Sequence, residues 1–115
     1  MSGNQSLNIV LDIGKTNVKL IFFNKNNKVV KSYNTKQKPS KKFGIKVLNS
    51  AEIYNWTMQK IKSMEKKSRL DKFVCTAHAC SIALINHEDQ ELVACTDYEF
   101  PYHKYIKEYQ KIVPS

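Results

Sequence analysis

Residues 7–23 read LNIVLDIGKTNVKLIFF and contain two apolar runs separated by one short polar turn. The runs, residues 7–13 and 18–23, are rich in Val, Ile, Leu and Phe, which strands favour. Gly14 and Asn17 supply turn chemistry between them. A link this short joins antiparallel neighbours, so the stretch predicts a pair of antiparallel strands at the start of the chain.

A third, weaker strand is predicted at residues 28–33, after a polar turn at residues 24–27. The three strands are joined by short links and therefore predict an antiparallel meander. Residues 34–46 are rich in Lys and carry Pro39 and Gly44, so we expect a loop there.

A helix is predicted after Asn49, which can cap it, with Glu52 as the reciprocal partner three residues on. Leu48 and Ile53, before and after the cap, fit a hydrophobic staple. Apolar residues at helical spacing predict the side of the helix that faces the core: Ile53, Tyr54, Thr57, Met58, Ile61 and Met64.

The second half of the chain predicts two further strands, at residues 72–76 and 80–86. A polar turn at residues 87–90 and a returning strand at residues 91–95 complete a hairpin. Pro101 is expected to open a last helix, with one side formed by Tyr102, Tyr105, Ile106 and Tyr109.

The length of 115 residues and mass of 13.3 kDa allow one domain. Apolar residues make up 42% and charged residues 25%, which excludes a disordered tail, a collagen-like repeat and a disulfide-scaffold toxin. No apolar run approaches the roughly 20 residues that a membrane helix needs.

The first six residues are polar and lack the features of a signal peptide, and we expect residues 1–6 to be disordered. Cys75, Cys80 and Cys95 are an odd number of cysteines without a spacing pattern. Such cysteines indicate reduced thiols, and we therefore expect a cytoplasmic protein.

The net charge of +9 has two interpretations. It can attract phosphate, either of a nucleotide or of a nucleic acid. It can equally reflect composition, because all but one of the 19 basic residues are Lys and they spread along the whole chain. Arg69 is the one residue able to contact guanine or phosphate through two parallel hydrogen bonds, so we favour the compositional interpretation.

The tripeptide at residues 14–16, Gly-Lys-Thr, matches the end of a Walker A loop. The full motif needs a Gly five residues before Gly14, where Ile9 stands. A Walker A loop also opens a helix, whereas residues 18–23 indicate a strand. We therefore exclude a Walker-type nucleotide site.

A different phosphate site fits these residues better. Asp12 ends an apolar strand, where a carboxylate is costly without a partner or a function. Backbone N–H groups in the following turn can form an anion-binding concavity, and Asp12 can hold Mg²⁺. On composition alone, an ordinary hairpin turn with a capping Asp is favoured over such a site, since Asp-x-Gly is common in turns. The polar and basic residues that would complete the phosphate site are Gly14, Lys15, Thr16, Asn17 and Lys19.

His78 follows a predicted strand and stands between two Ala residues. A lone His is more often structural than catalytic, but ligands gather at strand ends in open sheets. His87 and His103 lie in polar surroundings and receive no assignment. The His and Cys spacings match no zinc template.

Three blocks in order resemble the FGGY family of carbohydrate kinases. Residues 9–19 resemble the family's opening strand, its Asp-x-Gly-Thr/Ser turn and the basic residue beyond it. Residues 74–86 resemble its second block, in which a strand leads to a small-residue turn with His. Residues 91–99 resemble the strand that follows, with its aromatic and acidic end. The resemblance covers roughly residues 7–100.

This resemblance implies an α/β fold of the ribonuclease H-like, actin- and hexokinase-type class, incomplete in this chain. It also implies phosphoryl transfer from ATP to a sugar hydroxyl, with Mg²⁺ as cofactor. Asp12 would lie near Mg²⁺, residues 14–17 would form the phosphate turn, and Lys19 would point at the γ-phosphate. The sugar pocket would include Ala77, His78 and Glu99.

Two substitutions depart from the family pattern, since Lys15 replaces Thr or Ser and Ala79 replaces Gly. The resemblance is to a branch near rhamnulose and fuculose kinases. Family members are several times longer, and their general-base Asp and adenosine motif have no counterpart in this chain. Residues 7–115 are therefore expected to form the N-terminal part of the first kinase domain, without a second domain and inactive in isolation.

A second hypothesis is a small basic module that binds nucleic acid. It rests on the charge of +9 and on six Tyr residues that can stack on bases. The scarcity of Arg and the absence of any nucleic-acid-binding motif argue against it.

Overall fold

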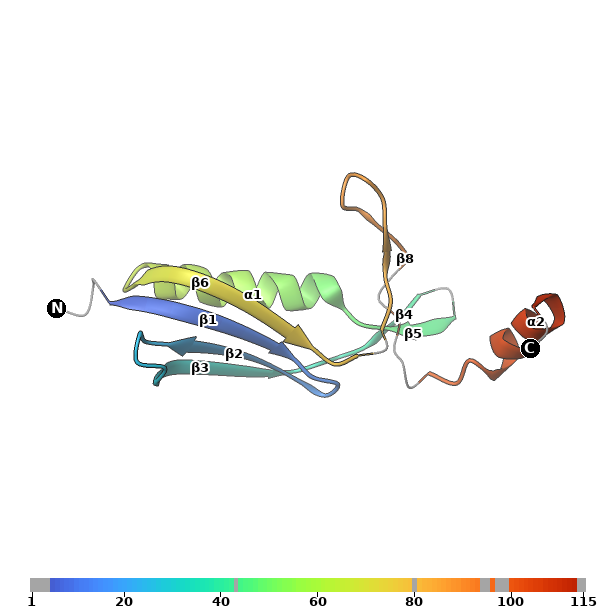
Figure 1. The fold of residues 1–115 in the computed structure, drawn as a ribbon, viewed down its shortest axis with the longest axis horizontal. Coiled ribbons are helices and arrows are strands. Elements are labelled where there is room, and N and C mark those ends of the chain that lie inside the picture. The colour runs from blue at the N-terminus through green and yellow to red at the C-terminus, as the bar shows by residue number, and fades with distance from the viewer. Residues whose placement is uncertain (1–4, 43, 80, 94–95, 97–99, 114–115) are drawn as a thin grey trace.

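The main sheet has four strands, and α1 lies against one of its faces (Figure 1). A computed structural model describes residues 5–42, 44–79, 81–93, 96 and 100–113. The sheet consists of β1 (Ser6–Ile13), β2 (Asn17–Phe23), β3 (Val29–Lys36) and β6 (Arg69–Ala77), in the order β3-β2-β1-β6.

Strands β1, β2 and β3 are antiparallel neighbours, which confirms the meander predicted from the short links. β6 runs parallel to β1, and a parallel pair needs a crossover, which α1 (Ser50–Glu65) provides. β1 begins at Ser6, which pairs with Arg69 and belongs to the stretch expected to be disordered, whereas residues 1–4 of that stretch lie outside the described residues.

The core lies between the sheet and α1. Alternate residues of β1 and β2 point to the helix, and the paired Leu11 and Leu20 are both buried. Trp56 also packs against this core, although the apolar stripe predicted for the helix omitted it. The buried apolar residues of this cluster are Leu7, Ile9, Leu11, Val18, Leu20, Phe22 and Met64.

The start of α1 is capped as the sequence predicts. The side-chain oxygen of Asn49 accepts a hydrogen bond from the backbone N–H of Glu52 at 3.3 Å. The Asn49 side-chain amide donates to the Glu52 carboxylate at 3.0 Å, which makes the interaction reciprocal. One member of the stripe, Tyr54, is 64% exposed and therefore not part of the core, although it lines the same groove as Met58 and Ile61.

The expectation of a loop over residues 34–46 was wrong. β3 continues to Lys36, and a short hairpin follows, formed by β4 (Ser40–Lys42) and β5 (Ile45–Val47). Gly44 adopts a φ of 76°, a left-handed conformation that glycine reaches without strain. Val47 is 1% exposed and anchors the hairpin through a bridge to Thr96.

The hairpin predicted in the second half is confirmed, and residues 80, 94 and 95 of its two expected strands lie outside the described residues. It is formed by β7 (Leu84–Ile85) and β8 (Glu91–Val93), so residues 81–83 and 86 of the first expected strand are not strand. The Asn86 side chain accepts from the backbone N–H groups of Glu88 and Gln90, each at 2.9 Å, and thereby closes the turn.

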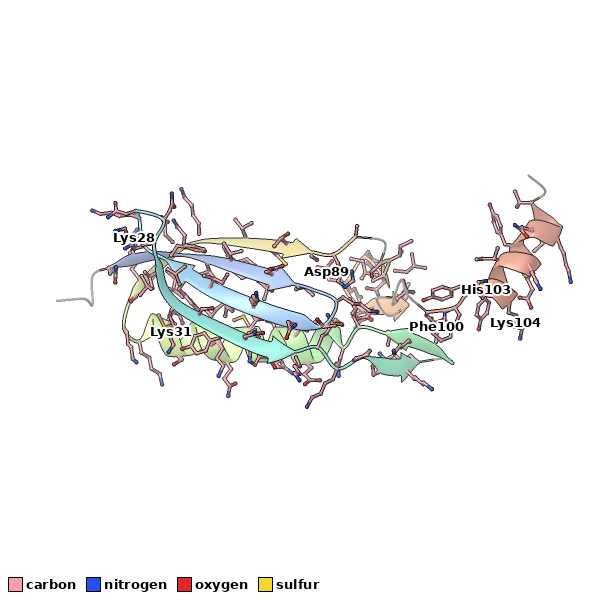
Figure 2. All side chains as sticks on the ribbon, turned by 90° about the horizontal axis from the view of Figure 1, so that it is seen from below. Lys28, Lys31, Asp89, Phe100, His103 and Lys104 are labelled. Carbon is pink, nitrogen blue, oxygen red and sulfur yellow. The ribbon has the colours of Figure 1, made fainter. Side chains whose placement is uncertain are left out.

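α2 (His103–Ile112) begins after Pro101 rather than at it, with Tyr102 as the N-cap residue. Figure 2 shows His103 and Lys104 at the start of this helix, far from the sheet and close to Phe100. The apolar side of α2 remains in solvent, with Tyr105 and Tyr109 exposed by 47% and 62%.

The molecule is elongated, with extents of 65 × 28 × 24 Å. Its radius of gyration is 18.2 Å, against about 13 Å for a compact domain of this length. Its accessible surface of 8730 Å² is roughly a third larger than the value expected for a compact monomer. Within the described residues, neither helix has the length and apolar character required to cross a membrane.

Candidate functional site

The turn between β1 and β2 is tight and depends on glycine. The backbone N–H of Gly14 donates to the carbonyl oxygen of Asn17 at 2.8 Å, which leaves Lys15 and Thr16 at the tip. A Cβ atom on residue 14 would lie 2.9 Å from that same oxygen. The absence of a side chain at Gly14 therefore allows the turn to be this tight. The Gly14 N–H is already hydrogen-bonded within the turn.

Gln37 braces this turn from the end of β3. Its backbone N–H donates to the carbonyl oxygen of Thr16 at 2.8 Å, and its side-chain amide donates to that of Gly14 at 2.6 Å. The Asn17 side chain also donates to the Thr16 hydroxyl at 3.0 Å. Sequence reasoning missed Gln37, because its role arises from the pairing of Asn17 with Lys36 and not from any local motif.

Asp12 and Lys19 are cross-strand partners, and Asp12 also pairs with Thr76. Their neighbours Leu11 and Leu20 are buried against α1. Because side chains alternate along a strand, Asp12 and Lys19 lie on the opposite face of the sheet. Asp12 is half-buried there, next to the turn, and Lys19 is exposed.

Asp12 is the carboxylate closest in sequence to the turn. Mg²⁺ sites in phosphate-handling enzymes commonly use one or two carboxylates, with the remaining ligands supplied by water and phosphates. A single half-buried carboxylate beside the turn fits such a sparse site. The described part of the chain contains no group of three or more His, Cys, Asp or Glu that could hold a metal by itself.

Ala77 and His78 lie at the end of β6, beside Ile13 of β1. The His78 backbone N–H donates to the Ile13 carbonyl at 3.0 Å and extends the parallel ladder. His78 is half-buried, and its Nδ1 lies 3.3 Å from the carbonyl oxygen of Ala79. Glu99, the third residue of the expected sugar pocket, lies outside the described residues.

Ala77 and His78 line a largely apolar groove between α1 and β6, with a volume of about 730 Å³. Sequence reasoning did not predict this groove. The structure therefore brings the predicted site residues other than Glu99 to one end of the sheet but distributes them over two faces. Asp12 and Lys19 are on one face, the groove is on the other, and the Gly14–Asn17 turn lies at the edge between them.

Known structures share this architecture, although no protein-family model matches the sequence and no curated protein resembles it significantly. A carbohydrate kinase from Novosphingobium aromaticivorans superposes on 94% of the chain with a TM-score of 0.82 and 18% identity. The fold is that of the N-terminal part of actin- and hexokinase-like kinases.

Two further sugar kinases, both from Lactobacillus acidophilus, match in the same way. A gluconate kinase covers 95% of the chain with a TM-score of 0.71 and 17% identity. A xylulose kinase covers 93% with a TM-score of 0.69 and 18% identity. The chain spans about a quarter of each of these proteins, between 22% and 23% of their length.

Proposed function

We propose that this chain forms the phosphate-binding part of an ATP-dependent carbohydrate kinase of the FGGY family, from a branch near rhamnulose and fuculose kinases. The observation that carries the proposal is the superposition on a carbohydrate kinase over 94% of the chain. The tight turn that follows Asp12, near the end of β1, supports it independently, because phosphoryl transfer requires fixed donors and a metal-binding group.

In the proposed enzyme the Gly14–Asn17 turn holds the ATP phosphates and Lys19 balances their charge. Asp12 holds Mg²⁺, which neutralises charge that develops during transfer. Ala77, His78 and Glu99 contact the sugar. Phosphoryl transfer depends mainly on positioning and charge neutralisation, which suits a rigid turn on a sheet. The general base comes from polypeptide beyond the quarter that this chain represents, and the enzyme acts in the cytoplasm.

Asp12 provides the test. The complete kinase, with the sequence of this chain as its first quarter, is assayed for ADP release with Mg²⁺, ATP and a panel of hexuloses, pentuloses, gluconate and glycerol. We expect Asp12→Asn to lower sugar-dependent turnover by about 100-fold or more, because the metal and the transferring phosphate lose their anionic partner.

Asp89→Asn is the matched control, since Asp89 is exposed in the turn of the β7–β8 hairpin and is not among the described residues that line the groove. This variant should retain full turnover. Full activity of Asp12→Asn would refute the metal assignment. A robust sugar-dependent rate from the isolated 115-residue chain would refute the proposal that it is one part of a larger active site.

A further inference from the structure

A second concavity lies on the β3 side of the β1–β2 turn, away from the groove that contains His78. We call it the basic cleft. It has a volume of about 400 Å³, and the described residues that line it, among them Lys15, Thr16, Asn17, Lys36, Gln37 and Lys46, include no carboxylate. Lys36 and Lys46 were not part of the phosphate site expected from the sequence.

Three separate segments bring the lysines together. Lys15 is at the tip of the turn, Lys36 ends β3 opposite Asn17, and Lys46 is in β5. On the β4–β5 hairpin, Lys46 is also directly opposite Lys41. Like charges in opposite positions on paired strands destabilise the pairing, so the hairpin carries an electrostatic cost. An anion bound in the cleft would offset this repulsion.

The cleft is also preorganised. The two hydrogen bonds from Gln37 fix the carbonyl groups of Gly14 and Thr16, so the turn is held against the end of β3. A binding site that is already rigid loses little conformational entropy when a ligand enters. The Thr16 hydroxyl and the Asn17 amide add neutral polar groups to the lining.

We propose that the basic cleft binds the phosphate groups of a small polyanionic ligand, with Lys36 and Lys46 as binding residues. Lysine is a compact charge that commonly contacts phosphate. The inference rests on the proposed function in one respect, namely that the β1–β2 turn faces phosphate. It extends the site to residues of β3 and β5 that lie outside the kinase-like sequence blocks.

The test measures binding to the 115-residue chain and needs no catalysis. Isothermal titration with inorganic tripolyphosphate is carried out at low and at physiological salt on wild type and on the Lys36→Gln, Lys46→Gln double variant. We expect saturable binding that the double variant weakens about tenfold or more, because two charge-assisted contacts are lost. The affinity should fall as salt rises.

The matched control is the Lys25→Gln, Lys28→Gln double variant, which removes the same charge. These residues belong to the β2–β3 connection, at the other end of the sheet, where Figure 2 labels Lys28. The control should change the affinity less than about twofold. Equal weakening by both pairs, or no saturable binding to wild type, would overturn the proposal. Unchanged circular dichroism spectra establish that both double variants fold.

Further titrations identify the source of the phosphate. Either order of affinity supports the proposal that the cleft binds phosphate. Tighter binding of ATP than of a hexose phosphate assigns the cleft to the nucleotide, and tighter binding of the hexose phosphate assigns it to a phosphorylated sugar. The proposal would be overturned if a single-stranded oligonucleotide bound more tightly than tripolyphosphate and if both lysine double variants weakened that binding equally. Phosphate binding that needs Lys36 and Lys46, without turnover by the complete enzyme, would refute the kinase proposal and leave this one intact.

Discussion

A methyl group on residue 14 would lie 2.9 Å from the Asn17 carbonyl oxygen, closer than Cβ atoms approach backbone oxygens. Gly14→Ala must therefore push the β1–β2 turn apart. We expect a loss of about 1–3 kcal/mol in the free energy of unfolding, measured by urea denaturation. Tripolyphosphate binding should weaken as well, because the turn lines the basic cleft.

Gly44→Ala is the control for this prediction. A Cβ at Gly44 would meet no atom within 4 Å, and the cost arises from its positive φ alone. We expect about 1 kcal/mol of destabilisation and little change in phosphate binding. If Gly14→Ala binds tripolyphosphate as wild type does, the turn does not contribute to the cleft.

Among single residues, the sequence predicted those whose roles are local. Gly14 was predicted to lie in a turn because a glycine between two apolar runs is typical of a tight link between strands. The contribution of Gln37 depends on the register between β2 and β3, which no pattern within residues 34–46 discloses. Lys36 and Lys46 were missed for the same reason, since one lysine among many shows its function only once the strands are placed.

At the scale of elements, the capped start of α1 gives the clearest prediction. Asn49→Ala removes the acceptor for the Glu52 backbone N–H and the donor to the Glu52 carboxylate. We expect the free energy of unfolding to fall by about 0.5–2 kcal/mol, measured by urea denaturation. Asn49→Ser, which restores a capping oxygen, should recover most of this loss.

The exposed Asn55, within α1, serves as the control. Asn55→Ala should leave stability unchanged or raise it slightly, because alanine is the better helix former in a helix interior. Equal losses for Asn49→Ala and Asn55→Ala would show that the cap contributes nothing beyond helix propensity.

Elements with strong local signals were predicted, and elements made by tertiary contacts were not. α1 has a cap and helical periodicity, and β1 and β2 are long apolar runs. The β4–β5 hairpin has strands of three residues rich in lysine, and its anchor is the bridge from Val47 to Thr96, far apart in the chain. These two strands are therefore too short for an alternation of apolar and polar residues to predict the hairpin.

For the whole molecule, the feature that bears most on self-association is the exposed edge of β6. Phe73 and Val74 are exposed by 49% and 58%, and no charged residue stands between Phe73 and Ala77. The opposite edge strand, β3, carries lysines at both faces, which discourage pairing between copies. We therefore expect concentration-dependent self-association of the isolated chain through β6, measured by sedimentation velocity.

Phe73→Lys and Val74→Lys should each shift this association towards monomer, because a charge on an edge strand opposes pairing. Val30→Lys on β3 is the control and should leave the association unchanged. If the isolated chain sediments as a monomer at every concentration, the β6 edge does not mediate self-association.

The resemblance to kinases led to the correct fold class, but the groove between α1 and β6 and the elongated shape were not predicted. Both depend on which surfaces remain uncovered after folding. Such surfaces cannot be read from hydrophobic periodicity, because a residue that faces the groove and a residue in the core have the same apolar character.

The parallel pairing of β6 with β1 also bears on biosynthesis. Ser6 meets Arg69, so the sheet cannot acquire its fourth strand until α1 has left the ribosome. The β1–β2–β3 meander can form first. Phe73 and Val74 are synthesised later and lie on β6, at the exposed edge of the sheet. An exposed apolar margin of this kind favours aggregation during synthesis, so we expect a nascent-chain chaperone to bind there.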